Sequence, residues 1–122
     1  MKVLLDTHVL LWALADDARL SAKHRDLISE DTEIFVSAAT VWEIAIKRAL
    51  GKLTAPANIA QTISALGCRP LAITWRHAEE AGALPPHHAD PFDRLLIAQS
   101  MVEDMPLATQ DSKITAYAVT TV

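Results

Sequence analysis

The sequence contains few of the residues on which several common kinds of functional site depend. It has 3 glycines and no glycine-rich segment, which excludes the usual phosphate-binding loops of nucleotide-binding domains. Its single cysteine, Cys68, has no intramolecular disulfide partner, and the neighbouring Leu66 and Leu71 indicate that it fills space in a core. We therefore expect neither nucleotide binding of the usual kinds nor redox chemistry.

Long apolar runs and an excess of positive charge are also missing. No uninterrupted apolar run approaches the roughly 20 residues that a membrane helix needs, and the first residues lack the basic flank and cleavage site of a signal peptide. These points predict a cytoplasmic protein without a membrane partner. The formal net charge of −4 has the wrong sign for holding nucleic acid by general electrostatics. A nuclease is not excluded, because carboxylates that bind a divalent cation lower the formal charge in the same way.

The chain is long enough and apolar enough for one domain with a large core. It has 122 residues, of which 51% are hydrophobic, and its mean hydropathy is +0.19. We expect a single domain over residues 1–122, since two domains would not fit. This apolar content is high for so small a chain. We therefore expect that some apolar surface, including Trp12 and its neighbours, is covered by a partner.

Short β-type runs alternate along the chain with stretches of helical periodicity. Strands are expected at residues 2–6, 33–37, 68–74 and 105–111. Helices are expected at residues 8–16, 20–31, 37–52, 56–67, 75–84 and 92–104, with a short helical segment at 112–118. Strands separated by helices predict right-handed βαβ units and a parallel sheet covered on both faces. The expected fold class is therefore a three-layer α/β/α domain with a central parallel sheet.

Several residues mark the expected ends of these elements. Ser37 is placed to start its helix, and Pro56 stands at a first-turn position of another. Pro70 moves its strand towards an edge of the sheet, because proline has no backbone N–H to donate to a neighbouring strand. Asp90 is the expected N-cap of the helix that begins with Pro91.

Four carboxylates fall at positions that a parallel sheet would bring together. Asp6 ends the first strand inside an otherwise apolar run, and Asp111 ends the last strand. Glu43 lies one turn into the helix after the second strand, and Asp93 lies in the first turn of the helix after "HHADP". Ligands gather outside the carboxyl ends of parallel strands. Like charges so close need a cation, and hard oxygen ligands suit Mg²⁺ or Mn²⁺.

Each acid also has a purely structural interpretation. Asp6 could cap the first helix, and Asp111 could be a turn or N-cap residue. Glu43 could form a surface pair with Lys47 at the favourable i,i+4 spacing. Asp93 could simply complement the dipole of its helix. Taken singly, none of the acids is a strong signal, whereas all four at one edge of a sheet predict a metal site.

Other kinds of site have less support in the sequence. His87 and His88 beside Asp90 could bind zinc, but a second ligand pair at a usable spacing is missing. A serine nucleophile elbow is absent. A metal-dependent phosphatase would have a second aspartate two residues after Asp6, where this chain has His8. A non-catalytic acidic module that docks a protein or RNA stays open, and it would differ from an enzyme in binding its partner without metal.

Four segments, taken together, resemble one known family. "LLDTHVLLW", "SAATVWEIAIK", "HHADPFDRLLIAQ" and "LATQD" occur in the order and approximate spacing of PIN domains. The chain is similar to the VapC-like ribonuclease toxins of type II bacterial toxin–antitoxin pairs. The resemblance spans nearly the whole chain, and "DPFDRLLIAQ" is its most specific part.

The resemblance implies a metal-dependent endoribonuclease with a defined acidic site. Carried over residue by residue, it implies that Mg²⁺ or Mn²⁺ is held by Asp6, Glu43, Asp93 and Asp111. It further implies a single-stranded or looped RNA substrate, a homodimer, and a small cognate antitoxin that blocks the site.

The resemblance also suggests supporting residues. Thr7 and Thr109 look like the small hydroxyl residues that orient the first and last acids or a water. Arg94 and Lys113 are reasonable phosphate contacts. The doubled acid in "DPFD" leaves the third ligand open between two residues. We choose Asp93 over Asp90, because an N-cap carboxylate already has the backbone N–H groups of the first turn as partners.

Overall fold

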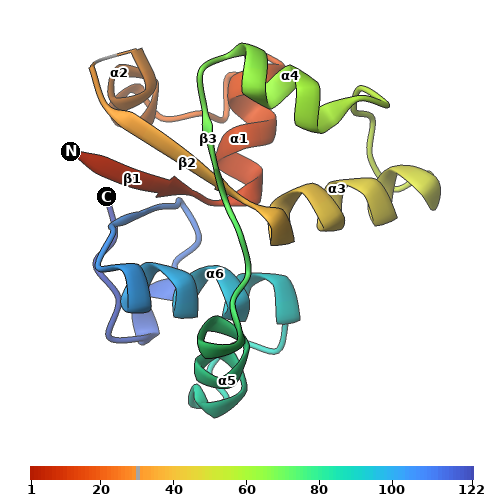
Figure 1. The fold of residues 1–122 in the computed structure, drawn as a ribbon. Helices are drawn as coiled ribbons and strands as arrows, with labels where there is room; N and C mark the ends of the chain where they lie inside the picture. Colours follow the sequence, from red (N-terminus) through yellow and green to blue (C-terminus); the bar gives the residue numbers. More distant parts are fainter. Residues whose placement is uncertain (30) are drawn as a thin grey trace.

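A four-stranded parallel sheet forms the centre of the molecule (Figure 1). The structure is a computed structural model, and it describes residues 1–29 and 31–122. The strand order is β3-β2-β1-β4, and every pairing is parallel. The strands are β1 (Lys2–Leu5), β2 (Glu33–Ser37), β3 (Arg69–Leu71) and β4 (Leu107–Ala108). The predicted α/β class with a parallel sheet is confirmed.

Helices cover both faces of this sheet, which gives the three expected layers. Figure 1 shows α1, α2 and α4 on one side of the sheet and α5 and α6 on the other. The helices are α1 (Thr7–Leu14), α2 (Ala22–Ser29), α3 (Ala38–Ala49), α4 (Ile59–Ala65), α5 (Trp75–Ala83) and α6 (Pro91–Glu103), with a 3₁₀ turn η1 (Ile114–Ala116). Among the helices of the described residues, none has the length and apolarity to cross a membrane.

The core is divided by the sheet into two apolar clusters. Val3 and Leu5 of β1 belong to the cluster that packs under α1, α3 and α4. Leu4, between them, belongs to the opposite cluster together with Leu96 and Ile97 of α6. Successive residues of a strand point to opposite faces, so a continuous apolar run is what a strand buried on both faces requires. Packing on both faces of the sheet thereby fixes the position of β1 and of Asp6, the residue that follows it.

The observed helices and strands differ from the expected ones mainly in length, and α4 begins at a different residue than expected. Pro56 is not in the first turn of α4, because the helix begins at Ile59 with Asn58, a residue type favoured at N-caps, in the N-cap position. Pro70 does lie in an edge strand, since β3 pairs with β2 alone in the sheet order. The expected helix at residues 20–31 includes residue 30, which lies outside the described residues.

Candidate active site

Asp6 occupies the point where β1 passes into α1. Its Oδ1 accepts a hydrogen bond from the His8 N–H at 3.0 Å, which makes Asp6 the N-cap of α1. Its Oδ2 accepts from the Thr109 hydroxyl at 2.6 Å. Only 2% of Asp6 is exposed. The structural interpretation as a helix cap therefore holds, and the same geometry places a buried carboxylate at the carboxyl edge of the sheet.

Glu43 of α3 is buried with one carboxylate oxygen left over. Lys47 Nζ donates to its Oε2 at 2.6 Å, and this hydrogen bond raises the pKa of Lys47. The expected i,i+4 pair is therefore present, but it is no surface pair, because the Glu43 side chain is only 3% exposed. Within the described residues Oε1 is buried without a hydrogen-bond partner. A buried unpartnered carboxylate oxygen is costly, and a cation would satisfy it.

Asp90 is the N-cap of α6, as predicted. Its Oδ1 accepts from the Asp93 N–H at 2.9 Å, and Pro91 stands in the first turn. The helix therefore starts where its sequence indicates, with its dipole and free N–H groups engaged by Asp90. Asp93 sits one turn further and has no capping role of its own.

The Asp93 carboxyl lies in a buried and negatively charged environment. Burial raises the pKa of this carboxyl from 3.8 to about 7, with the negative charges of Asp90 and Asp6 as the next causes. Glu43 contributes in the same direction, while His88 opposes the shift. The charges of the other acids therefore disfavour the ionised form of Asp93.

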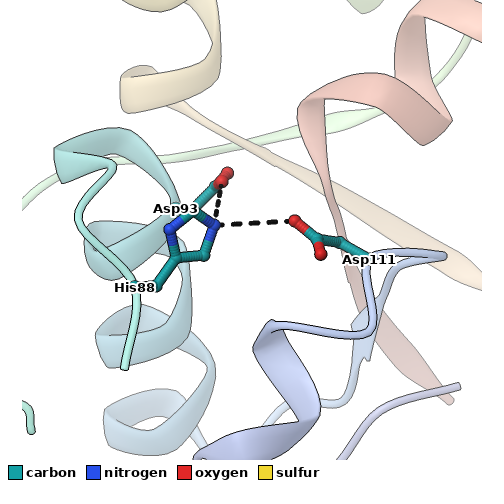
Figure 2. A group of neighbouring side chains, drawn as sticks. All are labelled: His88, Asp93 and Asp111. Atoms are coloured by element: carbon teal, nitrogen blue, oxygen red, sulfur yellow. Dashed lines mark ion pairs between the residues drawn. The ribbon is translucent and has the colours of Figure 1, made fainter. Parts of the chain in front are cut away.

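Asp111 joins the site from the segment after β4. Its Oδ1 accepts from the Lys113 N–H at 2.9 Å, so the expected turn role is also present. Its Oδ2 lies 3.5 Å from His88 Nε2, and the same nitrogen lies 2.9 Å from Asp93 Oδ2 (Figure 2). His88, Asp93 and Asp111 each offer a ligand atom, and these atoms all lie within 4.8 Å of one another. Asp93 and Asp111 thus lie together with His88, and Asp6 lines a cavity with Asp111. We use the name acidic cluster for the four predicted ligands Asp6, Glu43, Asp93 and Asp111, whose metal binding stays a prediction.

The two threonines expected to support the acids behave differently. The Thr109 hydroxyl donates to Asp6 and accepts from the Asp111 N–H at 3.0 Å, so it lies between the first and last acids. The Thr7 hydroxyl instead lies 3.1 Å from that of Thr40, inside the core. This contact joins α1 to α3, and the expected orienting role of Thr7 stays a prediction.

The Arg94 guanidinium is engaged by backbone carbonyls, and the phosphate contact expected of it stays a prediction. Its guanidinium donates to a group of carbonyls in the segment before α6 and lies 3.5 Å from the Tyr117 hydroxyl. The carbonyls belong to Ala81, Leu84, Pro85 and His88. A planar guanidinium with several donors suits this arrangement of acceptors. Arg94 thus fixes the loop that precedes α6. Lys113 is exposed, and its phosphate contact stays a prediction.

Replacing Arg94 with lysine should destabilise this loop. A single ammonium cannot reach all of these acceptors, so some of the carbonyls lose their partner. We expect the free energy of unfolding to fall by about 1–3 kcal/mol, measured by urea denaturation. Arg76→Lys on the exposed surface of α5 is the matched control and should change it by less than about 0.5 kcal/mol. Equal values for the two variants would show that Arg94 does not hold the loop.

The sequence does not predict the site roles of two residues. It offers His88 only as half of a zinc pair and Lys47 only as a surface partner of Glu43. The signal for Lys47 was its spacing from an acid already assigned to the site. The signal for His88 was its place two residues before the N-cap Asp90, although nothing in that spacing indicates where the ring points.

The acidic cluster opens towards α1. A cavity of about 240 Å³ is lined by Asp6, His8, Trp12, Gln110 and Asp111. A second cavity of about 410 Å³ reaches from Thr7 and Glu43 to Lys47 and Lys52. The first cavity is thus bordered by carboxylates, and the second by carboxylates and basic side chains together.

The structure thus defines a parallel α/β/α domain with carboxylates at the carboxyl edge of its sheet, which is the edge where such folds bind their ligands. Comparison with known proteins gives the family: the profile of the PIN domain matches residues 3–119, and the chain belongs to the PIN-domain family.

Similar proteins agree with this assignment. Ribonuclease VapC22 of Mycobacterium tuberculosis is 30% identical to the chain, and the match covers 94% of this chain and 91% of that protein. The structure of VapBC2 from Rickettsia felis, bound to a DNA fragment from its promoter, aligns with a TM-score of 0.68 at 14% identity over 99% of this chain and 96% of that one. A toxin–antitoxin complex from Klebsiella pneumoniae aligns with a TM-score of 0.67 at 21% identity over 95% and 92% of the two chains.

Proposed function

We propose that the protein is a Mg²⁺- or Mn²⁺-dependent endoribonuclease that acts as the toxin of a type II toxin–antitoxin pair. The observation that carries the proposal is the buried Glu43 oxygen without a partner, next to Lys47 and beside the other acids. Four oxygen-donor side chains fit a hard divalent cation. Membership of the PIN-domain family and the ribonuclease VapC22 relative support the reaction class.

The residues that would hold the ion are the acidic cluster. When bound, the ion supplies polarisation of a phosphodiester oxygen and lowers the pKa of a water. The protein's own contribution is to orient the ligands. Thr109 holds one oxygen of Asp6, and Asp90 fixes the start of α6 and with it the place of Asp93. Lys47 and Lys52 line the adjoining cavity, where they can contact phosphates on the substrate strand.

The proposed partners are a small antitoxin and a second copy of the chain. Trp12 proves half-buried, packed against the core and under Arg19, so it is a smaller part of the exposed apolar surface than we expected. The large apolar side chains that are exposed include Trp42, at 60%, and Trp75, at 91%. Trp42 also lines an apolar groove of about 550 Å³ between α3 and β3. The neighbouring structures that are toxin–antitoxin complexes support the antitoxin as partner.

Light scattering checks both proposed partners. We expect the purified protein to have a molar mass above that of the 13.3 kDa monomer, and the mass to rise further on co-expression with the small gene beside its own. The reason is that indole rings left in water favour a contact that covers them. A strictly monomeric protein under both conditions would contradict this part of the proposal.

A non-catalytic acidic binding module is the alternative from another class. Such a module would bind its partner equally well with and without metal, and it would leave the ends of RNA unchanged. Nothing in that function requires a buried carboxylate oxygen without a partner. The nuclease is therefore the better-supported function.

Sequencing of RNA 5′ ends after brief induction in cells tests the proposed function. We expect new 5′ ends that share a sequence or a loop, and the matched control is induction of the Asp93→Asn variant at equal protein level. Absence of new ends, or the same ends with the variant, would refute the proposal. The experiment also identifies the RNA target.

A further inference from the structure

His88 places a single ring nitrogen against two acids of the cluster. Its Nε2 lies 2.9 Å from Asp93 Oδ2 and 3.5 Å from Asp111 Oδ2 (Figure 2). We propose that His88 is a positioning residue, which holds Asp93 and Asp111 at the spacing that the metal requires without binding the metal itself. This inference rests on the proposed function, in which both acids are metal ligands.

The hydrogen bond to the other ring nitrogen determines which of the two carries the proton. His88 Nδ1 accepts from the Asp90 N–H at 3.3 Å. In a neutral imidazole the nitrogen that accepts has no proton, so Nε2 carries it. Nε2 therefore presents an N–H to the two carboxylates. Within the described residues Nε2 has no hydrogen-bond partner, so both contacts are close N···O approaches and not completed hydrogen bonds.

The same proton argues against His88 as a metal ligand. A ligating Nε2 needs a free lone pair, which would move the ring proton to Nδ1. The Nδ1 proton would then point at the Asp90 N–H, and two hydrogen-bond donors would face each other without an acceptor. Metal-bound histidines normally donate from their second nitrogen to an acceptor. In His88 the second nitrogen faces a donor, which fits a ring that orients ligands.

The ring is held in place through the backbone of its own residue. The His88 N–H donates to the buried Tyr117 hydroxyl at 2.8 Å, and that hydroxyl donates to the Pro85 carbonyl at 2.7 Å. The His88 carbonyl accepts from Arg94 at 3.3 Å. His88 is thus fixed by residues of α6 and of the C-terminal segment. A donor held so firmly can set the position of the carboxylates beside it.

The two acids need such a link because they come from different segments. Asp93 belongs to α6 and Asp111 to the turn after β4, and their charges repel each other. A shared N–H lets them approach while the remaining oxygen lone pairs stay free for a cation. Residues that orient metal ligands from behind contribute about tenfold to a hundredfold in metal affinity.

The test is a Mn²⁺ titration of full-length protein, followed by electron paramagnetic resonance. We expect His88→Ala to weaken Mn²⁺ binding by about tenfold or more. His88→Gln should restore most of the affinity, because the glutamine amide nitrogen reaches the position of Nε2, whereas His88→Asn should not, because its amide is too short. His87→Ala is the matched control and should bind as wild type, since His87 is exposed and packs on Tyr117.

Two results would overturn the inference alone. One is an unchanged Mn²⁺ affinity in His88→Ala when the wild type binds Mn²⁺. The other is a ¹⁴N coupling to bound Mn²⁺ in pulsed spectra that disappears in His88→Ala, since it would make His88 a direct ligand. If His88→Ala does not fold, equal affinities of the Gln and Asn variants would overturn it instead. A wild-type protein that binds no Mn²⁺ would refute the proposed metal-dependent function, and the inference with it.

Discussion

Replacing Asp93 with asparagine should reduce the rate of RNA cleavage by more than about a hundredfold. Loss of a residue that only orients a metal ligand already costs about tenfold to a hundredfold, and the loss of a ligand should exceed this. Asparagine keeps the shape of the side chain, and it removes a charge whose ionisation is opposed by burial and by neighbouring acids. The fold should remain intact. Initial rates at saturating Mg²⁺ and the circular dichroism spectrum check both points.

Asp90→Asn is the matched control for this variant. Asparagine caps a helix about as well as aspartate, so the hydrogen bond to the Asp93 N–H should survive. We expect a cleavage rate within a few-fold of wild type. If Asp90→Asn destroyed activity and Asp93→Asn were tolerated, the third ligand would be Asp90, and the site would have to be redrawn around the N-cap.

Divalent metal should stabilise the protein strongly, and more at pH 8 than at pH 5. In the metal-free fold the pKa of Asp93 is raised from 3.8 to about 7. Between these values the folded state binds more protons at this site than the unfolded state does. The contribution of Asp93 to stability is therefore complete below pH 4 and is lost as the pH rises through 7. A cation at the carboxylates replaces the proton and reverses this loss.

Thermal unfolding with and without Mn²⁺ measures the effect. At a metal concentration of about 100 times Kd, the gain is about 2.7 kcal/mol, which corresponds to several degrees in Tm. Asp93→Asn should have a shallower decline of metal-free Tm between pH 5 and pH 8, and a smaller response to Mn²⁺. A Tm of the wild type that is unmoved by Mn²⁺ at pH 8 would contradict the metal site.

The fold and the positions of the acids were predictable because each depends on local sequence. Strand β1 reads as an apolar run that ends in Asp6, and the boundary itself places that carboxylate at the edge of the sheet. The N-cap at Asp90 followed from Pro91 next to it. Such boundaries are set by a few adjacent residues. The layer architecture then brings the acids together without further information.

The supporting contacts could not be predicted, because they join residues distant in sequence. The Thr7 hydroxyl meets Thr40, 33 residues away, and its direction depends on how α1 packs on α3. Arg94 turns to the carbonyls before α6 because the loop there curls back over the helix. The ring of His88 likewise approaches Asp111, which belongs to a different segment of the chain. The spacing of residues along the chain does not determine where these side chains point.

Cleavage of RNA by the purified protein, with analysis of the product ends, decides whether the acidic cluster is a catalytic metal site. In the proposed function the four acids would hold the cation, and the cation would supply an activated water as the nucleophile. We predict cleavage with Mg²⁺ or Mn²⁺, complete loss in EDTA, recovery when the ion is restored, and products with 5′-phosphate and 3′-hydroxyl ends. Cleavage that persists in EDTA, or products with 2′,3′-cyclic phosphate ends, would contradict a metal-dependent mechanism at Asp6, Glu43, Asp93 and Asp111.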